Sequence, residues 1–305
     1  MSIKYLLIEF YSLFIYYIPN GIRELFLRIS RKRIILMCSF LDFKFGQFRP
    51  GNWGDDLNLY FIGKTTKARL VVYQTSLYSR WTHQPNYMCI GSMIHDVTPE
   101  TIVWGSGVIA DDADHELKHH PKKVLAVRGK LTREYLLKRG IACPEIYGDP
   151  ALLLPMFYPK NHSEKKYRLG VIPHIYDETN QYVTELKNNP DVLIISMKDY
   201  HDWHEIIDKI CSCDMIISSS LHGVIVSDAY QVPNCWIEFS DKVIGNGFKF
   251  RDYYSAVGKN IQKPVKIKQS IILEEVMKYQ KQWTAPCIDL EPLLQACPFQ
   301  LEKKY

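Results

Sequence analysis

Short apolar runs rich in β-branched residues recur along this 305-residue chain, and polar stretches of helical character separate them. Residues on both faces of each run are apolar, which is typical of a parallel sheet covered by helices on both sides. One set of runs covers residues 34–40, 70–74, 87–90, 101–108 and 124–127. A second set covers residues 167–173, 192–197, 215–218 and 234–239. The pattern predicts an α/β protein with two Rossmann-like, doubly wound domains.

The segments that lack this alternation indicate the domain boundaries. Residues 1–32 are aromatic and basic with apolar residues at helical spacing, and residues 158–166 form a polar, charged linker. We therefore expect an N-terminal Rossmann-like domain over residues 33–157 and a C-terminal one over 167–271. Residues 272–305 carry short helical patterns and are predicted to form a strap. Two such domains place their ligand in the cleft where the carboxyl ends of both sheets meet.

The composition restricts the class of ligand and the compartment. Lys and Arg number 38 against 33 Asp and Glu, a net charge of +5 that suits anionic small molecules or anionic lipid. That excess is too small to predict nucleic-acid binding. Neither a Gly-x-Gly-x-x-Gly nor a phosphate-loop pattern is present. The eight cysteines lie singly in mostly apolar runs or, at Cys211 and Cys213, without zinc or redox spacing, so a cytoplasmic protein with reduced thiols is expected.

The N-terminal apolar stretch leaves two alternatives open. Residues 5–18 include Glu9 and are too short to span a bilayer, for which about 20 apolar residues are needed. They also lack a small-residue cleavage site, and a basic segment ending at Arg33 follows them. Such a helix could lie on the inner face of the cytoplasmic membrane as a peripheral anchor. Alternatively, it could pack on the core with its basic end solvated.

A glycine-bearing turn at residues 51–58 follows the first clear strand and opens a helical stretch. Its backbone amides can point into the cleft and hold an anion or a polar sugar. Asn52, Asp55 and Asn58 are candidate acceptor-binding residues. Asp55 and Asp56 are also candidate general bases, because carboxylates beside sugar hydroxyls accept hydrogen bonds and protons. The alternative is an ordinary strand-to-helix turn.

Arg128 follows an apolar strand directly and precedes a helix. An arginine at the carboxyl end of a strand faces the predicted cleft, and its planar fork matches a carboxylate or phosphate. Arg128 is therefore the candidate anion clamp, with a structural salt bridge to a neighbouring helix as the alternative. Asp149, directly before Pro150, could cap a helix or contact a ligand, and we favour the structural role.

A serine-rich turn at residues 218–223 joins an apolar strand to an apolar helix. Hydroxyls and free amides at the start of a helix bind phosphate, and a histidine there can donate to phosphate or transfer a proton. The candidate residues are Ser219, Ser220, His222 and Gly223. A purely structural histidine is the alternative for His222.

A second basic feature lies in residues 241–254, where Lys249 and Arg251 follow a glycine-bearing turn and could close over an anion. A solvated basic loop is the alternative. The histidines and aspartates of residues 111–120, and His201 with His204, lie in strongly polar segments, so we predict no metal site.

Five ordered motifs together resemble the polysaccharide pyruvyl transferase family, especially its bacterial exopolysaccharide and capsule branch. They are Gly51–Asn58, Ala126–Thr132, Tyr147–Ala151, Ser219–Gly223 and Gly247–Tyr253. Each motif alone is weak, but their shared order makes chance agreement improbable.

The resemblance implies a fold similar to that of B-type glycosyltransferases, with the donor in the cleft. It implies transfer of the enolpyruvyl group of phosphoenolpyruvate to a sugar diol, which forms a pyruvate ketal and releases phosphate. Phosphoenolpyruvate is then a co-substrate, no further cofactor is expected, and the partner is a sugar acceptor, for which a lipid-linked oligosaccharide is one form. Arg128 and His222 fall on family motifs and are implied to contact phosphoenolpyruvate. Some members carry arginine at the position of Ser220, so Lys249 or Arg251 must supply that charge.

Two other functions remain open at this stage. The same two-domain cleft would suit a glycosyltransferase with a nucleotide-sugar donor. A non-catalytic, membrane-associated partner in glycan assembly would use the N-terminal helix and leave the cleft motifs unused. The identity of the donor separates the first alternative from pyruvyl transfer.

Overall fold

The computed structural model describes residues 3–160 and 164–302. The chain begins with three consecutive helical elements, α1 (Ile3–Ser12), the π-helical η1 (Leu13–Tyr17) and α2 (Ile18–Ile29). One side of α2 faces the protein, where Asn20, Glu24 and Leu27 are buried. The Asn20 side chain donates to the Phe43 carbonyl at 3.0 Å, and Glu24 accepts a hydrogen bond from Ser79 at 2.6 Å. The inner face of α2 is therefore fixed by polar bonds as well as by Leu27.

The first sheet is five-stranded and parallel throughout. Its order is β4-β1-β5-β6-β7. The strands are β1 (Ile34–Met37), β4 (Arg69–Val72), β5 (Asn86–Met88), β6 (Thr101–Trp104) and β7 (Lys123–Ala126). All five coincide with the apolar runs, so the sequence prediction of these strands is confirmed. The helical elements along this half are α3 (Trp53–Leu57), η2 (Asn58–Gly63), η3 (Tyr73–Thr75), α4 (Leu77–Trp81), η4 (Ile94–Asp96), η5 (Ala113–His115) and α5 (Lys130–Leu137).

A small antiparallel hairpin that the sequence analysis did not predict follows β1. It consists of β2 (Asp42–Lys44) and β3 (Gln47–Arg49). The turn between them is Phe45-Gly46, and both residues have positive φ angles of 52° and 71°. Glycine adopts that conformation at little cost, so Gly46 was the one local signal for this turn.

The second sheet is also five-stranded and parallel, in the order β12-β11-β10-β8-β9. Its strands are β8 (Tyr167–Ile172), β9 (Val192–Ile194), β10 (Cys213–Ser218), β11 (Asn234–Glu238) and β12 (Val265–Lys266). Four of them coincide with predicted runs; β12 has two residues and is too short to produce a pattern. The accompanying helices are α6 (Gln181–Leu186), α7 (Trp203–Cys211), α8 (Leu221–Ala229) and α9 (Phe248–Ala256).

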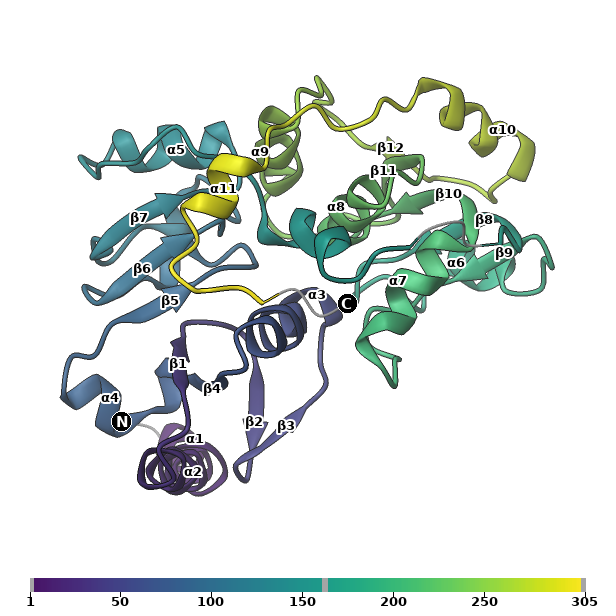
Figure 1. The fold of residues 1–305 in the computed structure, drawn as a ribbon. Coiled ribbons are helices and arrows are strands. Elements are labelled where there is room, and N and C mark those ends of the chain that lie inside the picture. Colours follow the sequence, from purple (N-terminus) through teal and green to yellow (C-terminus); the bar gives the residue numbers. More distant parts are fainter. Residues whose placement is uncertain (1–2, 161–163, 303–305) are drawn as a thin grey trace.

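The C-terminal segment returns to the first sheet after the second sheet is complete (Figure 1). It contains α10 (Leu273–Met277), η7 (Lys278–Gln282) and α11 (Glu291–Gln295). The Trp104 indole donates to the Leu293 carbonyl at 2.8 Å, and the Phe299 ring lies 4.6 Å from that of Tyr87. Earlier in the same segment, the Gln280 side chain donates to the Asp214 carbonyl at 3.2 Å, so the segment contacts both halves of the chain. Residues 161–163 of the predicted linker lie outside the described residues, and the predicted domain boundaries remain a prediction.

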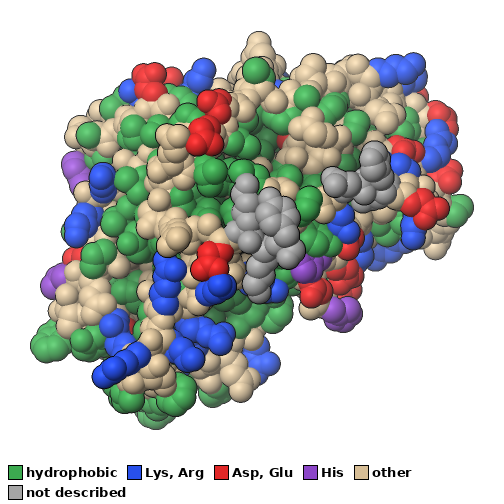
Figure 2. Space-filling model, viewed as in Figure 1, with side chains coloured by type: hydrophobic (Ala, Val, Ile, Leu, Met, Phe, Trp, Pro, Cys, Tyr) green, Lys and Arg blue, Asp and Glu red, His purple; other side chains and the backbone are tan. Residues whose placement is uncertain are grey.

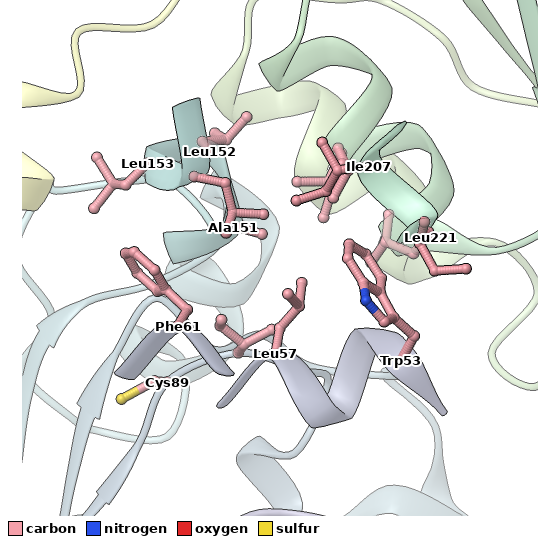
Figure 3. Packing of buried hydrophobic residues seen from close by; sticks show 14 of the residues in the cluster. Trp53, Leu57, Phe61, Cys89, Ala151, Leu152, Leu153, Ile207 and Leu221 are labelled. Carbon is pink, nitrogen blue, oxygen red and sulfur yellow. The ribbon is translucent and has the colours of Figure 1, made fainter. Parts of the chain in front are cut away.

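A hydrophobic cluster joins the two sheets into one body (Figure 3). Trp53 and Leu57 of α3 face Leu221 of α8 and Ile207 of α7 within this cluster. The 3-10 helix η6 (Pro150–Met156) lies between the halves and contributes Ala151, Leu152 and Leu153. The Trp53 indole also donates to the Trp203 carbonyl at 2.9 Å. The predicted α/β class with parallel sheets is confirmed, and α3 is packed firmly against the elements of the second sheet.

Candidate active site

A cavity of about 300 Å³ lies beyond the carboxyl ends of strands from both sheets. The first half of the chain contributes residues that follow β1 and β5, and the second half contributes residues that follow β8 and β10. Polar residues that line the cavity are Asn52, Asp55, Ser92, His174, Tyr176, Ser220, His222 and Lys249. In α/β sheets this is the edge at which ligands bind. The cavity is therefore the candidate active site.

Asn52 and Asp55 form the wall at the start of α3. Asn52 is the N-cap of that helix, because its side chain accepts a hydrogen bond from the Gly54 amide, and it donates to Asp55 at 2.9 Å. Burial, reinforced by the neighbouring Asp56, raises the pKa of Asp55 to about 6. The Asn52 hydrogen bond and the positive charge of Lys249 lower the same pKa. A carboxyl with a pKa near 6 is ionised at neutral pH and can still accept a proton.

Asp56 and Asn58, predicted at the same loop, do not line this cavity. Asp56 is buried and accepts hydrogen bonds from the Gly51 amide at 2.7 Å and the Tyr200 hydroxyl at 2.6 Å. Asn58 is fully buried and exchanges hydrogen bonds with both backbone groups of Ile90. Successive helical residues face different directions, so of Asp55, Asp56 and Asn58 only Asp55 reaches the cavity. Asp56 instead ties α3 to the loop before α7.

Arg128 is completely buried, and three of its donor groups are used within the protein. It donates to Asp252 of α9 at 2.9 Å, to the Ser92 hydroxyl at 2.5 Å and to the Val108 carbonyl at 2.6 Å. The salt bridge to a neighbouring helix, which the sequence left open, is therefore the observed arrangement. Ser92 lines the cavity and Arg128 stands behind it. Its charge still acts there, because it lowers the pKa of both His222 and Lys249.

The serine-rich turn brings only part of its predicted residues to the cavity. Ser220 is the N-cap of α8 and lines the cavity together with His222. The Ser219 hydroxyl accepts a hydrogen bond from the His174 amide at 2.7 Å and thus supports the wall from behind. Gly223 packs against Ser218, and a Cβ there would come closer than 3.0 Å to its hydroxyl. The start of α8 therefore presents its free amides beside the cavity, an arrangement that favours anions.

Burial keeps the His222 imidazole neutral near pH 7. Burial, followed by the charges of Arg128 and Lys249, lowers its pKa to about 3. Its Nε2 lies 3.8 Å from Oδ2 of the buried Asp149, and neither atom has a hydrogen-bond partner within the described residues. The other oxygen of Asp149 accepts from the Ala151 amide at 2.9 Å and caps η6. The structural role favoured for Asp149 is confirmed, and no local pattern in the sequence indicates its nearness to His222.

Lys249 and Arg251 are separated by the geometry of α9. Lys249 lines the cavity, and burial, followed by the charge of Arg128, lowers its pKa to about 8. Arg251 lies outside this cavity and donates to the Asn246 carbonyl at 2.7 Å. Of the two candidates for the charge absent at Ser220, the structure brings only Lys249 to the site.

Sequence reasoning missed Ser92, His174 and Tyr176. Ser92 follows β5 and His174 follows β8. Because ligands bind at the carboxyl ends of strands, these positions could have identified both residues as site candidates. Burial, followed by the charges of Lys249 and Lys198, lowers the pKa of His174 to about 4. His174 therefore adds a neutral hydrogen-bonding group to the cationic side of the cavity.

Across residues 3–160 and 164–302, no three His, Cys, Asp or Glu side chains are grouped in a way that could hold a metal ion. No helix in the same part of the chain has both the length and the apolar character needed to cross a membrane.

Comparison with known proteins connects the site to a family. The sequence pattern of the family described as polysaccharide pyruvyl transferase matches residues 13–241. An uncharacterized protein, L143, of Acanthamoeba polyphaga mimivirus is 27% identical over 249 residues, which are 80% of this chain and 83% of that protein. The succinoglycan biosynthesis protein ExoV of Rhizobium meliloti is 26% identical over 236 residues, 76% of this chain and 70% of ExoV.

A solved structure of an uncharacterized protein from Klebsiella pneumoniae has a TM-score of 0.43 and 12% identity, covering 82% of this chain and 99% of that one. This likeness is too slight to carry an argument.

Proposed function

The chain belongs to the polysaccharide pyruvyl transferase family and is a transferase enzyme, and from that premise we propose that it forms a pyruvate ketal on a sugar, with phosphoenolpyruvate as donor. The observation that supports this proposal is the composition of the cavity. Lys249, His222 and the start of α8 face the same small space as the Asp55 carboxylate. A donor that is a small dianion or trianion and an acceptor that is a diol require such a pairing.

The cationic side suits a three-carbon donor with a carboxylate and a phosphate. Lys249 supplies a point charge, and Ser92 and Ser220 supply hydroxyl donors. The free amides at the start of α8 supply further donors, as helix N-termini do for phosphate. Arg128 contributes its field from behind Ser92. Ser219 and Gly223 then shape the turn, and Arg251 remains a candidate only for the outer edge of the site.

The proposed reaction needs one acid and one base. His222, once charged, gives a proton to the methylene carbon of phosphoenolpyruvate, which leaves an oxocarbenium centre at the adjacent carbon. A sugar hydroxyl adds there and loses its proton to Asp55. Phosphate then leaves with the bonding electron pair and takes the proton held by Asp55. A second hydroxyl of the sugar adds to the same carbon and gives its proton to the carboxylate that this step frees. The products are the ketal and inorganic phosphate.

The finer fold assignment is part of the same proposal. Two parallel five-stranded sheets whose strands end at one cavity are what a B-type glycosyltransferase-like arrangement requires. We place the donor on the side of α8 and α9, and the sugar acceptor on the side of Asn52 and Asp55. No cofactor and no metal ion enters the proposed reaction.

We further propose that the acceptor is reached at a membrane surface. The outer face of α1 to α2 exposes large apolar side chains, among them Leu7, Phe10, Phe14, Ile22, Leu25, Phe26 and Ile29. Figure 2 shows hydrophobic side chains at this end of the molecule with Lys and Arg side chains gathered beside them. The exposed Arg31, Lys32 and Arg33 follow directly in sequence. An apolar helix face beside a basic cluster binds anionic bilayers, where a lipid-linked sugar would lie.

The central test uses purified protein, phosphoenolpyruvate and a panel of galactose-, glucose- and mannose-type acceptors. We expect phosphate release together with an acceptor mass increased by one pyruvyl ketal. Lys249→Met should abolish most of this activity, whereas the matched change Lys242→Met at an exposed lysine should not. Transfer from a nucleotide sugar, with no turnover of phosphoenolpyruvate on any acceptor, would overturn the proposed donor.

A further inference from the structure

Asp149 is completely buried and lies beside His222, which lines the cavity, whereas Asp149 does not. It precedes η6, and one of its oxygens is committed to the Ala151 amide. The second oxygen lies 3.8 Å from Nε2 of His222 and has no hydrogen-bond partner in the described chain. A buried polar atom without a partner is costly and is seldom retained without a role. Here two such atoms, one basic and one acidic, face each other.

The opposite edge of the His222 ring lies toward the turn at residues 51–58. A Cβ built on Gly54 would come closest to Nδ1 of His222, so this nitrogen lies against the segment between Asn52 and Asp55. Both of those residues line the cavity. The two ring nitrogens therefore face different neighbours: Nε2 faces Asp149, and Nδ1 faces Gly54 in the segment between Asn52 and Asp55.

We propose that Asp149 is the positioning residue of His222: it accepts the Nε2–H of the imidazole and so leaves Nδ1 to exchange protons with the substrate. This inference rests on the proposed function for the identity of that substrate. A carboxylate behind a histidine fixes the tautomer and the orientation of the ring and stabilises the imidazolium. The separation of 3.8 Å exceeds a hydrogen bond, and such bonds commonly shorten when the substrate is bound.

The proton balance is simple. Nδ1–H of the imidazolium gives its proton to the methylene carbon, the double-bond electron pair forms the new C–H bond, and the N–H electron pair stays on Nδ1. Nε2 keeps its proton, and Asp149 accepts the Nε2–H bond in its ionised form. Burial raises the pKa of Asp149 to about 7, and Arg128 opposes that rise. Binding of an anionic donor between Lys249 and His222 raises the pKa of the imidazole, and Asp149 then provides its counter-charge.

The first experiment reads the tautomer directly and does not depend on turnover. Nitrogen-15 NMR of the histidine side chains, with the His222 signals assigned by their loss in His222→Gln, should show Nε2–H and an unprotonated Nδ1. Asp149→Asn keeps an oxygen for the Ala151 amide but presents an NH₂ group to Nε2, so the proton should move to Nδ1. An Nδ1–H tautomer in the unaltered protein, or no change in Asp149→Asn, would overturn the proposal.

The second experiment separates positioning from folding. In Asp149→Asn we expect kcat for phosphate release to fall about 10- to 100-fold, with KM for phosphoenolpyruvate little changed, as for other partners that orient a histidine. Asp149→Ser retains a helix-capping oxygen and cannot reach His222, so it should show a similar loss at an unchanged melting temperature. Full kcat in folded Asp149→Ser would contradict the assignment.

A matched control exists on the surface of the same protein. Asp202 caps α7 by accepting from the His204 amide at 2.9 Å, and it also lies 2.8 Å from Nδ1 of that histidine. Asp202→Asn therefore makes the same chemical change at a helix cap beside a histidine, far from the cavity lining. It should leave kcat and the His222 tautomer unaltered. If no acceptor supports turnover in the unaltered protein, the proposed function fails while the tautomer measurement still decides the role of Asp149.

Discussion

Gly54 lies directly against His222: a Cβ on Gly54 would stand within 3.0 Å of the imidazole ring. Gly54 belongs to α3 in the first half of the chain, and His222 belongs to α8 in the second. Because Gly54 has no side chain, His222, the proposed acid, can occupy its position beside α3. The contact also explains why a glycine follows Trp53 in the loop that forms the acceptor side.

Gly54→Ala should impair activity through His222. The added methyl group must displace the ring or separate the two halves, and overpacking of this kind costs about 1–3 kcal/mol of stability. We expect a fall in kcat of at least about tenfold, because a small misplacement of a reacting group has large effects. Gly63→Ala is the control, since a Cβ at Gly63 meets its nearest neighbour at 3.6 Å. Equal kinetics for the two variants would contradict this account of Gly54.

Arg128→Ala should lower the free energy of unfolding, in addition to any effect on substrate binding. Arg128 and Asp252 are both completely buried and lie 2.9 Å apart. Removal of one partner of a buried ion pair leaves the other charge uncompensated and costs about 3–5 kcal/mol. Denaturant unfolding should show this loss, with a smaller one in Arg133→Ala, whose ion-pair partner Glu145 is exposed. A stable Arg128→Ala protein would show that the pair is dispensable for folding.

Asp55→Asn should stabilise the protein near neutral pH while it removes the proposed base. The folded-state pKa of Asp55 is raised from 3.8 to about 6, so the folded state binds the proton more tightly than the unfolded state does. That stabilisation is present below about pH 4 and is lost as pH rises through 6. The free energy of unfolding of Asp55→Asn should exceed that of the unaltered protein by on the order of 1–3 kcal/mol at pH 7.5, and the two should be equal at pH 3.5. Melting temperatures across this range, with exposed Asp199→Asn as control, measure the difference.

Binding of phosphoenolpyruvate should weaken at alkaline pH because of Lys249. Burial and Arg128 lower the pKa of this lysine to about 8, so the ammonium of the free enzyme loses its charge as pH rises through that value. The binding constant measured by calorimetry should fall by about tenfold for each pH unit above 8. Lys249→Arg keeps its charge there and should flatten the profile, whereas exposed Lys242→Arg should not. An unaltered profile in Lys249→Arg would assign the pH dependence to another group.

The α1 to α2 face should bind anionic vesicles. Ile22 and Phe26 are 65% and 68% exposed, and their joint replacement by serine should reduce co-sedimentation with vesicles that contain phosphatidylglycerol. Neutral glutamine at Arg31 and Lys32 should weaken binding by about 1 kcal/mol each and should matter less at high salt. Ile272→Ser, remote in sequence and 54% exposed, is the control. A change in oligomeric state without vesicle binding would identify the face as an interface between copies of the chain.

The strands were predictable because their signal is local. An apolar run such as residues 34–37 is stable as a strand only when both of its faces are buried, as in a parallel sheet covered by helices. All nine predicted strands occur in two parallel sheets. The family was predictable for a related reason, since its motifs are short and keep their order along the chain. The hairpin at residues 42–49 and the two-residue β12 were not, because neither contains enough residues to set a period.

The residues that follow strands can be read from local patterns, which is why Asp55, Ser220 and His222 were expected near one sheet edge or the other. Which of them lie together depends on how the two halves pack. Asp55 lines the cavity and Asp56 does not, because one residue of helix turns a side chain away. Arg128 follows β7 as predicted, but its guanidinium binds Asp252 and does not line the cavity, since a partner 124 residues away in sequence leaves no local trace. The nearness of Asp149 to His222 arises in the same way, from packing between the two halves, which the spacing of apolar residues along the chain does not reveal.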